Sequence, residues 1–287
     1  MQIYQGMDIG TAKATKEERA LVPHHMIDVV SPLENYSVGK YRSAAIKTAE
    51  KIVARGKLPL FVGGTGLYYD SLIRNPDESV PESNKEYTEK MLSFADSEEK
   101  RIALWRRLYE IDPESAENIH YNNLRRVIRA LEIYESSGRK KSDIDKESRL
   151  RRSPLSVSLV SLDFHNRENL YKRIDTRVDL MVRDGLLEEV QALYEKGLLK
   201  DGSTALSGIG YKEIISHLRG EITLEEAISK IKLSSRRYAK RQLTWFRHIE
   251  EKHSLFLDTE FGEMRKTEDV FSELLDTVKE LSLGELN

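Results

Sequence analysis

A glycine-rich turn that directly follows an apolar run is the first feature of this sequence that could bind a ligand. The apolar run 58–62 leads at once into Gly63, Gly64, Thr65 and Gly66. A short apolar run bounded by turn residues predicts a buried strand, and helical spacing resumes after the turn. A strand, a glycine turn and a helix together form the place where open α/β sheets bind anionic ligands. The motif also occurs as a plain structural turn, so by itself it indicates a ligand site only weakly.

Arginines on two predicted helices could bind a polyanion. The basic segments are LRRVIR at 124–129 and SRRYAKRQLTWFR at 235–247, whereas the net charge of the whole chain is −2. Arg125 and Arg129 are four residues apart and therefore share one helix face. Local positive charge on a nearly neutral protein suits a specific site for phosphates. The alternative is that both segments are ordinary solvated helix faces.

The elements that would position the glycine turn alternate between strand and helix. A second apolar segment, 26–30, also predicts a buried strand, and an amphipathic helix is predicted over 36–54 with Ser37 as its N-cap. The order strand, helix, strand, helix predicts a parallel sheet.

The pattern of residues changes between 76 and 152, where charged helical segments follow one another without strands. Consecutive helices cannot extend a parallel sheet, so this region is predicted to be an inserted all-helical subdomain. The predicted helices are 83–95, 98–111 and 122–137, followed by a polar, mobile linker over 140–154. The remaining segments, 1–75 and 153–287, form the predicted α/β core.

The second part of the core returns to the sheet and then becomes largely helical. A strand is predicted within 155–164 and another at 254–257. Helices are predicted at 166–183, 185–196, 211–218, 223–232, 234–250 and 268–283.

Composition limits the class of protein. No apolar stretch approaches the roughly 18 residues that suggest a membrane span. The chain has no cysteine, which excludes disulfides and thiolate metal sites and fits a reducing cytoplasm. His24 and His25 are adjacent, and neighbours on an extended chain point to opposite faces, so they do not predict a metal site. The N-terminus lacks the features of a signal peptide.

Four motifs, in order and spread over nearly the whole chain, closely resemble those of the bacterial tRNA dimethylallyltransferases. They are GMDIGTAK at 6–13, GGTGLY at 63–68, IGYKE at 209–213 and AKRQLTWFR at 239–247. The resemblance implies a P-loop-kinase-like α/β fold, a parallel sheet core with an inserted all-helical subdomain that clasps the tRNA anticodon stem-loop. It further implies a cytoplasmic protein that acts as a monomer.

The chemistry implied by this resemblance is prenyl transfer. N6 of the adenosine 3′-adjacent to the anticodon attacks the first carbon of dimethylallyl diphosphate, and diphosphate leaves with the help of Mg²⁺. Such a reaction needs cations on the leaving group, an acceptor for the amine proton and a pocket for the extruded base.

The resemblance also assigns roles to individual residues. The catalytic assignments are Arg177, as the diphosphate-binding cation, and Thr65. The substrate-contacting assignments are Met1, Gln2, Gly63, Gly64, Gly66, Arg125, Arg126, Val127, Ile128, Arg129, Arg241, Gln242, Thr244 and Trp245.

Each assignment has a structural alternative. Arg177 could pair with Asp175 or Asp179 within its own helix. Arg126 could be a surface charge of no consequence, and Trp245 lies at a spacing that also suits the core.

The sequence departs from the family pattern in two places. The pattern starts upstream with Gly-x-x-x-x-Gly-Lys-Ser/Thr, a loop that binds diphosphate and magnesium. That motif is absent from the 287 residues, as is the aspartate general base that should lie just before Met1. Tyr87 falls where the family often has an arginine that contacts tRNA. We therefore expect the chain as written to be poorly stable and catalytically inactive.

Two other functions are compatible with this pattern. One is a tRNA-binding protein that has lost catalysis, which the absent loop favours. The other is an isopentenyltransferase acting on free adenine nucleotides. The predicted helical insertion argues against the latter, because a mononucleotide needs no clasp.

Overall fold

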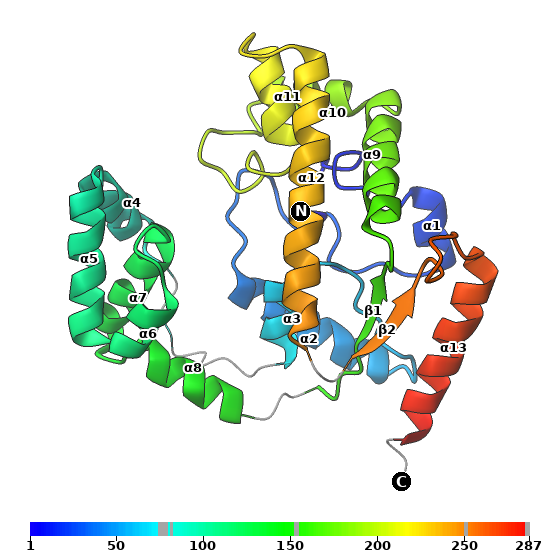
Figure 1. Ribbon diagram of the computed structural model, residues 1–287, viewed down its shortest axis with the longest axis horizontal. Helices are drawn as coiled ribbons and strands as arrows, with labels where there is room; N and C mark the ends of the chain where they lie inside the picture. Colours follow the sequence, from blue (N-terminus) through cyan, green and yellow to red (C-terminus); the bar gives the residue numbers. More distant parts are fainter. Residues whose placement is uncertain (74–79, 81–82, 152–154, 250–251, 285–287) are drawn as a thin grey trace. The chain divides into compact units, whose positions relative to one another are not determined.

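The computed structural model describes residues 1–73, 80, 83–151, 155–249 and 252–284. They form two compact units, coloured by sequence in Figure 1. We call Met1–Tyr68 with Val157–Asn287 the discontinuous unit, and Tyr69–Ser156 the helical unit.

The discontinuous unit combines helices with a small parallel sheet. Strands β1 (Val160–Asp163) and β2 (His253–Phe256) pair in parallel, with Val160 opposite His253. This pairing agrees with the predicted α/β class. Its helices are α1 (Lys16–Leu21), α2 (Val38–Val53), α9 (Arg167–Arg183), α10 (Leu186–Glu195), α11 (Tyr211–Leu218), α12 (Leu224–Arg247) and α13 (Thr267–Gly284), and α3 (Gly66–Ile73) begins in it.

Two predicted strands of this unit are wrong. The run 58–62 forms no strand among the described residues, and Leu58, Leu60 and Val62 are 71%, 79% and 87% exposed. An apolar run becomes a buried strand only when a neighbouring strand completes its hydrogen bonds. The segment 26–30 forms a single parallel bridge, between Tyr4 and Val30, because positive φ angles at two of its residues interrupt the extended backbone.

The core of the discontinuous unit joins the N-terminal segment to helices α10, α11 and α12. Its most deeply buried side chains are Tyr4, Met7, Leu186, Val190, Ala205, Tyr211, Ile214 and Ala227. The predicted helices 223–232 and 234–250 are in fact one helix, α12, because the serines near their junction do not break a helix. It begins with a capping box at Thr223, as predicted.

Asp258, just after β2, ties the sheet to the start of α9. Its buried carboxylate accepts the backbone N–H groups of His165 and Asn166 at 2.7 and 3.1 Å and the side-chain amide of Asn169 at 2.8 Å. Burial acts to raise the pKa of Asp258, but these hydrogen bonds outweigh it and hold the pKa below its usual value.

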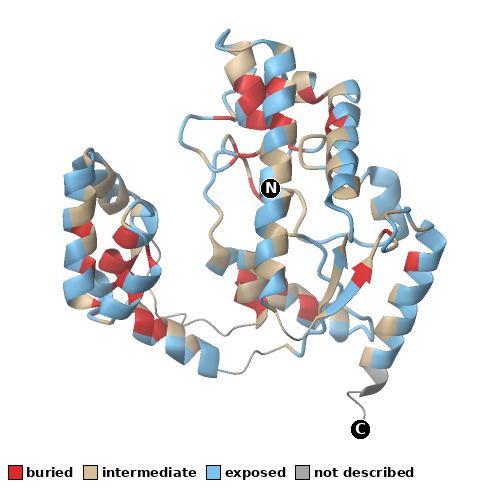
Figure 2. Cartoon of the chain, viewed as in Figure 1, coloured by how far each residue is buried: buried red, intermediate tan, exposed pale blue. Residues whose placement is uncertain are grey.

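The helical unit contains α4 (Lys85–Phe94), α5 (Glu98–Ile111), α6 (Pro113–Asn118), α7 (Leu124–Ser137) and α8 (Lys141–Leu150). Buried residues of this unit lie on α5, α6, α7 and α8, as the red segments of Figure 2 show. The predicted linker 140–154 is wrong over α8. Asp112, the N-cap of α6, also accepts the backbone N–H of Ser142 at 3.0 Å, and Ile144 is buried, so this polar segment is anchored as a helix.

Within the described parts of the chain, we find no helix that combines the length and apolar character needed to span a bilayer.

Candidate active site

The glycine turn packs against the C-terminal half of α12. The side-chain amide of Gln242 donates a 2.7 Å hydrogen bond to the carbonyl oxygen of Gly64. Two motifs that are far apart in sequence are thereby brought together within one unit.

Two of the three turn positions lie so close to α12 that a Cβ atom there would force a neighbouring side chain to move. A Cβ atom at Gly64 would lie 1.9 Å from Nε2 of Gln242, and a Cβ at Gly66 would lie 2.3 Å from the Trp245 ring. Gly63 has open space in the direction of its missing side chain. The turn is therefore shaped by the helix it contacts rather than by left-handed backbone angles.

The hydroxyl of Thr65 lies at the same junction. Its Oγ1 atom is 3.4 Å from the Tyr238 hydroxyl, and either group can be the donor. Tyr238 was missed by sequence reasoning. Its spacing to Gln242 and Trp245, four and seven residues, is the signal that would have placed all three on one helix face.

Further residues of α12 frame this junction. The guanidinium of Arg241 lies over the Tyr238 ring, 5.5 Å from its centroid. Trp245 is half-buried, because one face covers the turn. Thr244 is exposed, and its hydroxyl donates back to the carbonyl of Lys240 at 2.9 Å. Arg241 and Thr244 thus face solvent, while Gln242 and Trp245 hold the turn.

Arg177 is an exposed cation on α9. The two aspartates that could have paired with it form ion pairs with α12 instead. Asp175 pairs with Arg236 and Asp179 with Lys232, both at 2.6 Å. Arg177 itself makes no hydrogen bond or ion pair to any residue that the structure describes. Partial removal from water and the neighbouring charge of Arg173 lower the pKa of Arg177. A bound anion would relieve both effects.

Glu189 on α10 binds the GMDIG segment directly, although the two are 181 positions apart in sequence at Asp8. The carboxylate of Glu189 accepts the backbone N–H groups of Asp8, Ile9 and Gly10 at 2.9, 2.6 and 3.1 Å. It also accepts the hydroxyl of Tyr211 at 2.6 Å. Burial and the charge of Glu189 raise the pKa of Tyr211. This network joins the first and third family-like motifs.

The residues expected beside the target adenine start the same segment. The side-chain amide of Gln2 donates to the carbonyls of Thr11 and Ala12 at 3.1 and 3.0 Å. Met1 is 38% exposed. Within the described chain, neither residue is hydrogen-bonded to the glycine turn or to Arg177, so their joint role with those groups stays a prediction.

In the helical unit, α7 carries the predicted arginine face. Arg125 and Arg126 are exposed and have no side-chain partner among the described residues, whereas Arg129 pairs at 2.7 Å with the buried carboxylate of Glu132. Val127 and Ile128 are completely buried. The prediction that these two contact substrate is corrected for their side chains, which pack in the interior of the unit.

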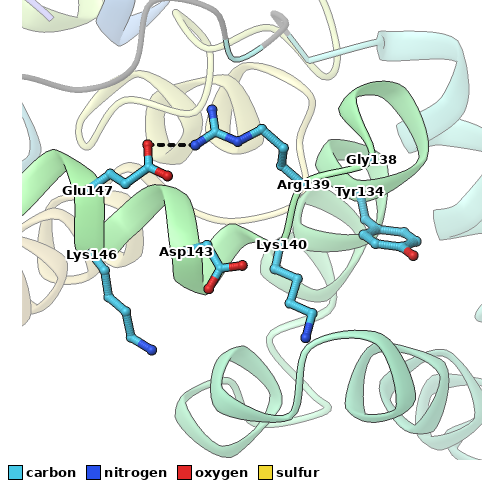
Figure 3. A pocket seen from close by; sticks show the side chains of 7 residues that line it. All are labelled: Tyr134, Gly138, Arg139, Lys140, Asp143, Lys146 and Glu147. Carbon is cyan, nitrogen blue, oxygen red and sulfur yellow. Dashed lines mark hydrogen bonds and ion pairs between the residues drawn. The ribbon is translucent and has the colours of Figure 1, made fainter.

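A hollow between α7 and α8, about 570 Å³ in volume, is also charged (Figure 3). Its cations are largely neutralised within the protein, since Arg139 pairs with Glu147 at 2.6 Å and Lys146 pairs with Glu114. This hollow therefore offers little net charge to an anion.

Over the described residues, the chain is an α/β protein with the layout of a phosphate-handling transferase. It has a small parallel sheet, a glycine turn held against a basic helix, and an unpaired arginine on an adjacent helix. Comparison with known proteins identifies the family. The chain belongs to the IPP transferase family, whose model matches residues 2–249.

Individual relatives agree with this assignment. The chain is 46% identical over 282 residues to the tRNA dimethylallyltransferase of Caldanaerobacter subterraneus subsp. tengcongensis, covering 97% of this chain and 88% of the relative. The crystal structure of the tRNA isopentenylpyrophosphate transferase of Bacillus halodurans matches with a TM-score of 0.67 and 38% identity, covering 100% of this chain and 88% of that one. A eukaryotic dimethylallyltransferase acting on tRNA matches with a TM-score of 0.76 and 29% identity, covering 89% and 65%.

Proposed function

We propose that this chain is a tRNA dimethylallyltransferase that moves a dimethylallyl group from its diphosphate to N6 of the adenosine 3′-adjacent to the anticodon. The observation that carries the proposal is the contact of the glycine turn with α12, within a chain of the IPP transferase family. It joins the two motifs from which the family-like site is built. The bond from N6 to the first carbon forms as the bond from that carbon to the diphosphate oxygen breaks, and the amine loses a proton.

Arg177 is the proposed partner of the departing diphosphate. Because the neighbouring aspartates pair with α12, its guanidinium can form bidentate hydrogen bonds to phosphate oxygens. A fixed cation of this kind stabilises the negative charge that develops on the leaving group. The Thr65 hydroxyl, beside that of Tyr238, is the proposed polar contact to the reacting part of the substrate.

The proposed RNA contacts lie in both units. In the helical unit, Arg125 and Arg126 provide charge for the phosphates of the anticodon stem-loop. Arg129, paired with Glu132, orders their helix and contributes less charge. In the discontinuous unit, Met1, Gln2, Gly63, Arg241, Gln242, Thr244 and Trp245 are the proposed contacts near the target base.

Magnesium is part of the proposal only as a companion of the diphosphate. Among the described residues, no group of three or more His, Asp or Glu side chains is arranged to hold a metal ion, so the donor set does not fit a resident magnesium. Mg²⁺ commonly keeps several waters and binds through substrate phosphates. No step of the proposed mechanism depends on it. We further propose that the protein acts as a cytoplasmic monomer.

Transfer of labelled dimethylallyl from its diphosphate to unmodified tRNA tests this function. The assay is run on the 287-residue chain and on the chain extended upstream in frame. The form that shows transfer is called the active form below. Label at N6 of the expected adenosine would support the proposal. Absence of transfer by both forms, with tRNA still bound, would contradict it and favour the binding-only alternative.

The relatives favour neither the binding-only alternative nor transfer to free nucleotides. They are named as tRNA dimethylallyltransferases and are 46–48% identical to this chain. Free AMP as acceptor in the same assay tests the second of them directly.

A further inference from the structure

A second hollow in the helical unit has a different character from the charged one. It has a volume of about 570 Å³ and lies where α5, α6 and the start of α7 meet. Its walls are mainly apolar, from Ile102, Trp105, Ala116 and Ile119. A hollow of this size and lining can enclose a flat organic group.

The main wall is rigid. The indole N–H of Trp105 donates to the carbonyls of Ala116 and Ile119 at 3.1 and 2.7 Å, which fixes the ring between α5 and α6. Beside it, the His120 and Tyr121 rings stack on each other at 4.3 Å between centroids. Three aromatic rings therefore line one hollow, and stacking on an aromatic ring needs no particular hydrogen-bond pattern from the ligand.

Polar groups with unused hydrogen-bonding capacity lie at the edge of the hollow. The amide of Asn118 donates to the Glu114 carbonyl, which leaves its own carbonyl oxygen available. Asn123, at the N-cap position of α7, makes no side-chain capping bond. Nδ1 of His120 accepts the backbone N–H of Asn122 at 3.2 Å, which assigns the proton to Nε2 and makes that atom a donor.

Basic groups at and beside the hollow can contact a phosphate. Arg106 lines it and has no ion pair among the described residues, and Arg125 and Arg126 follow Asn123 within the first turn of α7. Glu117 is the one carboxylate among the lining residues of this hollow, and it can accept from an exocyclic amine. Aromatic faces, amide edges and unpaired arginines are the groups that recognise an unpaired nucleotide.

We propose that this hollow binds one unpaired base of the RNA, separate from the adenosine that is modified. The inference rests on the proposed function for the presence of RNA. The base stacks on the Trp105 ring, Asn118, Asn123 and Nε2 of His120 contact its edge, and Arg106 contacts an adjoining phosphate. The helical unit would then bind bases as well as backbone.

Fluorescence tests the proposal without requiring catalysis. The chain has two tryptophans, so a Trp245→Phe variant reports Trp105 alone. Titration with unmodified tRNA should quench Trp105, and a short single-stranded RNA of mixed sequence should do the same, whereas a blunt RNA duplex should not. Equal responses to duplex and single strand would overturn the proposal.

Two groups of variants separate contacts to the base edge from charge. His120→Ala and Asn123→Ala should each weaken tRNA binding by about three- to tenfold, without changing the dependence on salt, because each removes a hydrogen bond to the base and no charge. Arg106→Ala should instead reduce the slope of log affinity against log salt by about 0.7. Tyr134→Ala is the matched aromatic control because Tyr134 lines the other hollow, and it should bind as the unsubstituted chain does.

The outcomes distinguish this proposal from the proposed function. Binding by His120→Ala and Asn123→Ala within twofold of the unsubstituted chain would overturn the base site, even if transfer is normal. Absence of transfer to tRNA by both forms of the chain would overturn the proposed function, and the single-stranded RNA would then test the hollow by itself.

Discussion

The side-chain amide of Gln242 donates a hydrogen bond to the carbonyl oxygen of Gly64 across 178 positions of sequence. This bond leaves the hydroxyl of Thr65 beside that of Tyr238. The glycine turn is consequently held by a helix rather than by a strand, and its geometry depends on how closely α12 approaches.

Adding a methyl group at Gly66 should displace the turn from α12. The new Cβ would lie 2.3 Å from the rigid Trp245 ring. We expect Gly66→Ala to lower the transfer rate of the active form by at least about tenfold and to reduce stability by about 1–3 kcal/mol, the usual cost of overpacking. Steady-state kinetics and thermal unfolding measure the two effects.

Gly63→Ala is the matched control, since nothing lies within 4 Å of a Cβ there. It should retain near-normal stability. Equal loss of stability in both variants would show that the close approach of Trp245 is not what requires glycine.

Removing the cation at Arg177 should slow catalysis while leaving the fold intact. Its side chain is exposed and makes no internal ion pair among the described residues, so little stability is at stake. We expect Arg177→Ala to lower the transfer rate by about 10²-fold, the scale of removing one charge-stabilising group. Arg177→Lys should recover part of this rate, because it keeps the charge without the planar fork.

Arg183→Ala removes a cation from the same helix, where it pairs with Asp184 at the surface, and should leave the rate unchanged. A normal rate in Arg177→Ala would remove Arg177 from the mechanism.

The arginine face of α7 should reveal itself in the salt dependence of tRNA binding. Arg125→Ala together with Arg126→Ala should weaken binding and reduce the slope of log affinity against log salt by about one for each phosphate that is no longer neutralised. Anisotropy titrations at several salt concentrations measure this slope. Arg149→Ala, at an exposed arginine of α8, is the control for one removed charge, and an effect there half as large as that of the double variant would indicate general attraction rather than a defined face.

Asp258 should make the discontinuous unit sensitive to acid. A carboxyl whose folded pKa is depressed contributes stability above its unfolded pKa of about 3.9, and this contribution disappears as pH falls through the folded pKa. We expect Asp258→Asn to be less stable at pH 7 and to show a smaller further loss below about pH 4. Parallel curves of unfolding free energy against pH for the two proteins would contradict this role.

Helices were more predictable than strands because their signals are local. The prediction 98–111 matches α5 and 211–218 matches α11, each with residues that cap or interrupt the chain at its ends. The run 58–62 shows the opposite case, because its apolar sequence alone cannot supply a paired neighbour. The polar segment that forms α8 was missed because Asp112, distant in sequence, anchors it.

The candidate site was predictable as a set of motifs but not as a geometry. The motifs indicated Thr65, Gln242 and Trp245, yet sequence spacing cannot show that Gln242 reaches Gly64. The same holds for Arg177. Sequence alone cannot show that it lacks an ion pair, because this depends on α12 supplying partners for Asp175 and Asp179.

The carboxylate of Glu189 accepts hydrogen bonds from three backbone N–H groups of the N-terminal loop. This contact also determines when that loop can complete its folding during synthesis. Glu189 is translated about 180 residues after that loop, which at usual elongation rates is a delay on the order of 10–40 s. The helical unit, which is continuous in sequence, can collapse during this interval. The loop carrying the first motif cannot complete its hydrogen bonds to Glu189 in this interval, because α10 and Tyr211 have not yet been synthesised.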